Sequence, residues 1–138
     1  MITEDYVSLE TAKLLKEKGF DYYPDGSYWL IDANNVMYWV SEIGAYDYVD
    51  NPTESFQRPK NGYRLVTQAM AMKWLREVYD CVICITPLTF YCGEIVSKWG
   101  YCIWADDNTV VDEESSPRLE SYEEAGEAAI KYCLENLI

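Results

Sequence analysis

The sequence predicts an α+β fold: an antiparallel sheet of about four to five strands with three helices packed mainly on one face. The chain has 138 residues, of which 49% are hydrophobic and 25% charged, so it can bury a core without disulfides or metals. Three stretches with helical spacing alternate with β-rich stretches, and short turns join neighbouring β-rich stretches. We therefore expect one domain over residues 1–138, with the order α-ββ-loop-α-ββ(β)-α.

A helix followed by a hairpin is predicted at the start of the chain. Ser8 is a typical N-cap, apolar residues follow at helical spacing, and Gly19 suits the left-handed position that ends a helix. Two β-rich stretches, 28–32 and 36–40, are separated by Ala33-Asn34-Asn35. Asparagine tolerates the left-handed backbone of a tight turn, so these stretches predict a β-hairpin.

The middle of the chain predicts a long loop and then a second helix. Residues 44–62 contain two prolines and no clean period, which predicts a loop with a short edge strand around 46–49. Thr67 begins a segment with an apolar stripe at helical spacing. A continuous β-branched run, 81–86, predicts a strand that Pro87 interrupts.

Two further strands and a helix complete the predicted fold. Residues 99–105 predict a strand, and 109–111 a short additional one. The last helix begins at Ser121-Tyr122-Glu123-Glu124, a capping box in which the serine and Glu124 satisfy each other's terminal amides. We expect this helix to run nearly to Ile138.

Charge and composition exclude several classes of function. The formal net charge is −13, from 24 acidic and 11 basic residues, so the surface repels phosphate backbones and anionic lipids. We expect no nucleic-acid partner and no membrane association.

The acidic start, residues 1–5, is unlike a secretory signal, so a cytoplasmic location is expected. The sequence has no histidine, which excludes Ser-His-Asp and Cys-His catalysis. We expect a protein that is not an enzyme and holds no cofactor.

The five cysteines raise the question of a metal site. They lie at positions 81, 84, 92, 102 and 133. The first four include a Cys-x-x-Cys pair and could supply four thiolates to zinc. Residues three apart on a strand point to opposite faces, however, so Cys81 and Cys84 are poorly placed to share an ion. We therefore predict reduced, buried thiols and no metal.

Aromatic residues make up 15% of the chain and are dense in the predicted hairpin. Tyr28, Trp29, Tyr38 and Trp39 are the candidates there for a partner-binding face. The simpler interpretation is a sheet whose faces accommodate large rings. If the helices cover one face, the other exposes rings, which would favour association with a partner or with a second copy as a homodimer.

Acidic residues crowd the last third of the chain. The candidates for an acidic partner-binding face are Asp106, Asp107, Asp112, Glu113 and Glu114. A solvated loop is the simplest interpretation. Cation binding is a second, although the spacing lacks the ligand pattern of an EF-hand. A third is a negative face that docks on a basic protein surface, as nucleic acid does.

Two resemblances add to these predictions. The runs 7–21, 67–77, 121–125 and 128–137 resemble uncharacterised small acidic proteins encoded by anaerobic gut bacteria and their phages or mobile elements. This resemblance implies a setting and no activity. The predicted order over 67–138 is similar to the double-stranded-RNA-binding domain. That family grips phosphates with lysines at the start of its last helix, where this chain has acidic residues, so the likeness implies the fold without the ligand.

These observations favour a small non-enzymatic phage or mobile-element protein that acts by protein-protein contact through the aromatic hairpin or the acidic face. The alternative is a module that binds a small ligand or a metal. A hydrolase is a third hypothesis, and it needs a pocket lined by two carboxylates in unequal environments.

Overall fold

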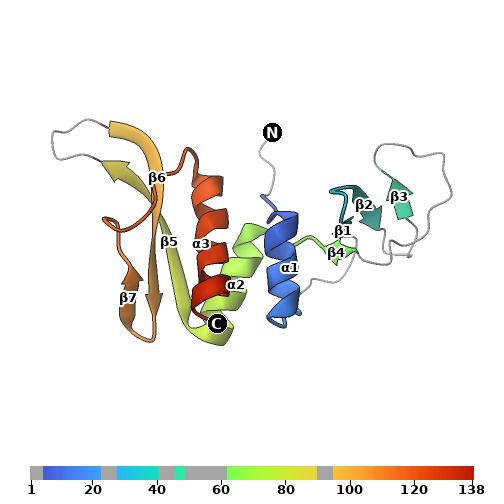
Figure 1. The fold of residues 1–138 in the computed structure, drawn as a ribbon, viewed down its shortest axis with the longest axis horizontal. Helices are drawn as coiled ribbons and strands as arrows, with labels where there is room; N and C mark the ends of the chain where they lie inside the picture. Colours follow the sequence, from blue (N-terminus) through green and yellow to red (C-terminus); the bar gives the residue numbers. More distant parts are fainter. Residues whose placement is uncertain (1–4, 23–27, 41–45, 49–61, 90–94) are drawn as a thin grey trace.

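The computed structural model of the chain describes residues 5–22, 28–40, 46–48, 62–89 and 95–138. Among these residues, runs of antiparallel strands lie between the helices, and the α+β class predicted from the sequence is confirmed (Figure 1). The elements are α1 (Leu9–Glu17), β1 (Tyr28–Ile31), β2 (Met37–Val40), β3 (Tyr46–Tyr48), β4 (Tyr63–Arg64), α2 (Gln68–Tyr79), β5 (Cys81–Thr89), β6 (Ile95–Ala105), β7 (Asn108–Val111) and α3 (Tyr122–Asn136).

The prediction of one sheet is wrong, because the described strands divide into two. The first sheet has the order β3-β2-β1-β4 and the second the order β5-β6-β7, and the pairs in both are antiparallel. β4 leads into α2, whose 12 residues carry the chain about 18 Å away before β5 begins. β5 therefore starts far from the edges of the first sheet and pairs with β6.

The helices form a layer between the two sheets (Figure 1). α2 and α3 pack against β5, and α3 also packs against β6, whereas α1 packs against α3 and β4. The prediction that helices cover mainly one face therefore describes α2 and α3 but not α1. The main core fills the space between these helices and the second sheet; its fully buried members include Leu15, Leu75, Ile103, Ile130 and Leu134.

The start of α1 is held by its own cap and by α3. The Ser8 hydroxyl accepts the backbone N–H of Thr11 at 3.2 Å, and Gly19 has a φ of 87°, so both predicted ends of this helix are confirmed. The Glu127 carboxylate accepts the Ser8 N–H at 3.1 Å and the Thr11 hydroxyl at 2.5 Å. Thr11 is fully buried. One carboxylate on α3 therefore anchors the first turn of α1.

The predicted hairpin is confirmed as β1 and β2. The Asp32 carboxylate accepts the N–H groups of Asn34 and Val36, each at 2.9 Å, and Asn35 has a φ of 64°. The Asp32 carboxylate thus accepts two turn N–H groups in place of backbone carbonyls, and Asn35 takes the left-handed position of the turn. A strand predicted around residues 46–49 is observed as β3, whereas 49–61 lie outside the described residues.

Pro87 does not end β5 as predicted, since the strand continues to Thr89. β5 is an edge strand, and Trp99, the residue opposite Pro87, exchanges backbone hydrogen bonds with Leu119 instead. The β5–β6 pair therefore needs no backbone N–H from residue 87. An edge strand accepts proline at such a position, because the missing N–H would have faced solvent.

Half of the predicted capping box at α3 is confirmed. The Ser121 hydroxyl accepts the Glu124 N–H at 3.1 Å. The Glu124 carboxylate, however, accepts the N–H of Glu120 at 3.0 Å, one residue before the expected partner. Both contacts still satisfy amides at the start of the helix.

Candidate functional site

The four aromatic residues proposed in the hairpin lie on both faces of the first sheet. Trp29 and Trp39 are opposite each other across β1 and β2, with ring centroids 5.1 Å apart in an edge-to-face arrangement. Tyr28 lies under the Arg64 guanidinium, 4.0 Å from ring centroid to cation, and the Tyr38 hydroxyl donates to Asp32. All four aromatic residues are half-buried. They are not gathered on one open face, and their role as a partner site stays a prediction.

The five proposed acidic residues bracket β7. Asp106 and Asp107 form the turn between β6 and β7, both with positive φ, and Asp112, Glu113 and Glu114 follow directly after β7. All five are exposed. The backbone and hydroxyl of Ser115 donate hydrogen bonds that lower the pKa of Asp112, so this carboxylate stays ionised to a lower pH than an ordinary aspartate.

An open apolar surface lies beside these carboxylates, on the face of the second sheet that points away from α2 and α3. We call it the outer face. Alternation along the strands decides its members: Cys81 and Ile103 point into the core, so their strand neighbours point outward. Val82 is 39% exposed, Trp104 38% and Val110 38%. The outer face consists of Val82, Cys84, Cys102, Trp104 and Val110.

No described helix or strand covers the outer face (Figure 1). Val82 pairs with Trp104 across β5 and β6, and Cys84 pairs with Cys102, so the apolar side chains form a continuous strip. Burial raises the pKa of Cys102, and the nearby Cys84 adds to this effect. The negative charges of Glu113 and Asp112 raise it further, so these carboxylates lie close to the outer face. The structure thus brings the proposed acidic residues to the edge of an apolar surface.

Sequence reasoning missed the residues at the centre of this surface. The alternation of positions 82 and 84, and of 102 and 104, was present in the sequence as a signal of two strand faces. Both faces are apolar, however, so the pattern does not tell which one the helices cover.

The cysteines lie on both sides of the second sheet, as the strand geometry predicted for Cys81 and Cys84. Cys81 and Cys133 are buried in the core, as predicted. The prediction of buried thiols is wrong for Cys84, which is exposed because its side chain lies on the outer face. Burial is the main reason that the pKa of Cys133 rises to about 12. Cys92 lies outside the described residues. Within the described ranges, no three cysteine, aspartate or glutamate side chains are grouped so as to hold a metal ion.

These environments predict selective alkylation. In native protein at about pH 8, the Cys133 thiolate fraction is on the order of one in ten thousand, because the pKa lies about four units higher. We expect N-ethylmaleimide to label Cys84 quickly, and Cys81 and Cys133 after denaturation, as measured by peptide mass spectrometry. Labelling of Cys133 at the rate of Cys84 in native protein would contradict the packing described above.

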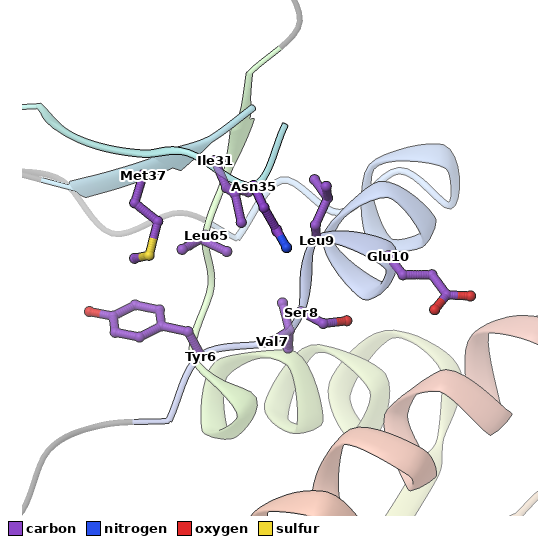
Figure 2. Close-up of a pocket in the computed structure, with 9 residues that line it drawn as sticks. All are labelled: Tyr6, Val7, Ser8, Leu9, Glu10, Ile31, Asn35, Met37 and Leu65. Atoms are coloured by element: carbon purple, nitrogen blue, oxygen red, sulfur yellow. The ribbon is translucent and has the colours of Figure 1, made fainter. Parts of the chain in front are cut away.

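A broad hollow of about 580 Å³ lies between the first turn of α1 and the first sheet (Figure 2). Its lining is mainly apolar, and the side chains of Met37, Leu65 and Asn35 extend toward the segment before α1 in Figure 2. Two of its polar groups are already engaged: Ser8 caps α1, and Glu10 pairs with Lys131 at 2.7 Å. The hollow therefore offers apolar contact but few groups that would select a ligand.

Among the described residues, no helix has the length and apolar character required to cross a lipid bilayer. The order of α2, β5, β6, β7 and α3 agrees with the order predicted for 67–138. Comparison with known proteins gives no match to a family model, to a curated protein or to a solved structure. The function is therefore argued from the geometry of this chain.

Proposed function

We propose that this chain is a non-enzymatic interaction protein whose outer face binds a basic segment of a partner protein. The segment places apolar side chains over Trp104 and Val82, and its lysine or arginine residues meet the carboxylates around β7. The observation that carries the proposal is the uncovered apolar strip beside five exposed carboxylates. The proposal retains protein contact and the acidic face from the sequence, and replaces the aromatic hairpin by the outer face.

The apolar strip supports binding because it is continuous and contains a tryptophan. Isolated exposed apolar residues are common on protein surfaces, whereas adjacent ones mark contact sites more often. Tryptophan is enriched among residues that dominate binding energy, since its large ring buries much area at little entropic cost. Trp104 pairs with Val82 on β5 and Thr109 on β7, so the rigid sheet holds it in place.

Charge favours a basic partner over a second copy of this chain. Two copies joined through their outer faces would bring their acidic edges together, in molecules that each carry a formal net charge of −13. Like charges at an interface are unfavourable, whereas a basic segment is attracted from a distance. A partner with lysine or arginine beside apolar residues therefore satisfies both parts of the surface.

Two features of the sequence support the remaining parts of the proposal. The chain has no histidine, which favours a role in binding over catalysis. Its resemblance to small acidic proteins of gut bacteria and their phages or mobile elements supports a cytoplasmic role in such a setting.

A selection from a random peptide library tests the proposal. The full chain serves as bait, and we expect selected peptides to combine apolar residues with lysine or arginine. Their affinity should fall by about tenfold for Trp104→Ser, because a central tryptophan contributes more than most interface residues. A triple variant at the exposed acidic residues, Asp112→Asn, Glu113→Gln and Glu114→Gln, should also weaken binding and reduce its dependence on salt.

Tyr122→Ser is the matched control, since Tyr122 is an exposed aromatic residue, 47% exposed, on α3. Equal binding to the wild type, to Trp104→Ser and to the triple variant would contradict the proposal. Selection of acidic peptides would also contradict it, and so would a homodimer that Trp104→Ser dissociates.

A further inference from the structure

A second hollow, of about 330 Å³, lies between α1 and the first sheet, and its lining includes Lys16 and Arg64. Its buried apolar members are Ala12, Phe20 and Leu30, which are 4%, 5% and 3% exposed. The rest of its lining comes from Lys16, Tyr28, Gly62, Tyr63 and Arg64. We call it the cationic pocket. It joins an apolar base, two tyrosine rings and two cations.

Tyrosine rings hold three cations at this place. The Lys16 ammonium lies 5.1 Å from the Tyr63 ring centroid, and that of Lys13, beside the pocket, lies 5.7 Å from the same centroid. The Arg64 guanidinium lies 4.0 Å from the Tyr28 ring centroid. The cation–π contacts with Tyr63 orient the two lysines and leave their positive charge in place.

The two lysines lack carboxylate partners within the described part of the chain. Salt bridges there join Lys98 to Glu120, and Lys131 to Glu10 and Glu135. Lys13 and Lys16 instead lie against the ring of Tyr63. Lys13 and Lys16 are neighbours on one face of α1, and an anion placed between them would relieve their mutual repulsion.

We propose that the cationic pocket binds a small organic anion, with a carboxylate or phosphate group attached to a flat ring. Lys16 and Arg64 bind the anionic group, because charged hydrogen bonds are the strongest that either side chain forms. The flat ring contacts Tyr63 and the apolar base formed by Ala12, Phe20 and Leu30.

The volume of the pocket and the negative charge of the whole chain restrict the ligand to a small molecule. A volume of about 330 Å³ is at the lower end of the range for ligand pockets. A polyanion such as RNA would extend beyond the pocket onto a chain of net charge −13, which repels it. A compact anion stays within the pocket, where Lys16 and Arg64 lie, and these side chains, which tyrosine rings already order, lose little freedom when it binds.

Isothermal titration calorimetry with 2-naphthoate on the full chain tests the proposal. We expect saturable binding of 2-naphthoate, and binding about tenfold weaker for the uncharged analogue 2-naphthalenemethanol. 2-Naphthyl phosphate distinguishes the two anionic groups: tighter binding than naphthoate assigns the pocket to phosphate esters, and weaker binding assigns it to carboxylates.

Two variants with equal changes of charge locate the site. Lys16→Gln should weaken naphthoate binding by about fivefold, whereas Lys73→Gln, at an exposed position of α2, should leave it unchanged. Tyr63→Leu should also weaken binding, through loss of the ring that orients both lysines. Trp104→Ser should have no effect, which separates this pocket from the proposed partner site.

Three results would overturn the proposal. The first is no binding of either anion at millimolar concentration, and the second is equal affinity for the anion and the neutral alcohol. The third is an equal effect of Lys16→Gln and Lys73→Gln, since a nonspecific response to net charge would then explain the data.

Discussion

Replacing Leu75 by alanine is expected to lower the free energy of unfolding by about 2–5 kcal/mol. Leu75 is fully buried in the core between α2, α3 and the second sheet. Alanine would remove buried methyl groups and leave a cavity that the surrounding core side chains cannot fill without moving. Urea denaturation followed by tryptophan fluorescence gives the change directly.

Val78→Ala is the matched control for this prediction, because Val78 lies on the same helix and is 51% exposed. Its effect should stay within about 0.5 kcal/mol, as is usual for surface positions. Equal losses for the two variants would mean that α2 does not present Leu75 to the core.

Glu127→Ala should lower the free energy of unfolding by about 1.5–3 kcal/mol, the usual range for hydrogen bonds to a charged group. The Glu127 carboxylate accepts the backbone N–H of Ser8 and the hydroxyl of the buried Thr11. Alanine leaves both donors without this acceptor, so the first turn of α1 loses this attachment to α3, while the Glu10–Lys131 ion pair remains. We expect α1 to open before the rest of the core. Urea denaturation gives the global effect, and hydrogen exchange shows whether the amides of α1 lose protection first.

Glu113→Ala provides the control, since it removes the same charge from an exposed position after β7. It should leave both stability and α1 exchange unchanged. If Glu113→Ala matches Glu127→Ala, relief of negative charge and not the anchor determines the result. A Glu127→Ala variant with normal protection of α1 would equally contradict the anchoring role.

Local signals predicted most of the elements correctly because short-range chemistry determines them. The caps at Ser8 and Thr67, and the turn containing Asn35, each depend on hydrogen bonds or backbone angles within four residues. The division into two sheets depends on where the chain lies in space after α2. A pattern of neighbouring residues does not contain this information. Pro87 was misjudged for the same reason: its tolerance depends on the partner that Trp99 finds elsewhere in the fold.

The candidate site was predicted in part. Charge density identified the acidic residues around β7, such as Asp112, because their exposure follows from their chemistry. Trp104 and Val82 were missed because a strand that is apolar on both faces does not show which face is covered. The cationic pocket was also missed. It brings together Lys16 on α1 and Arg64 on β4, which are 48 positions apart in the sequence, so only the folded chain places them side by side.

The indole N–H signals of the tryptophans in a ¹H–¹⁵N NMR spectrum test the central claim most directly, when a selected basic peptide is added to the full chain. Trp104→Phe assigns the signal of the outer face. We predict that the Trp104 signal shifts with the peptide concentration, while that of Trp74, buried in the core, does not. A shift of Trp29 or Trp39 with Trp104 unchanged would place the partner on the hairpin and contradict the account.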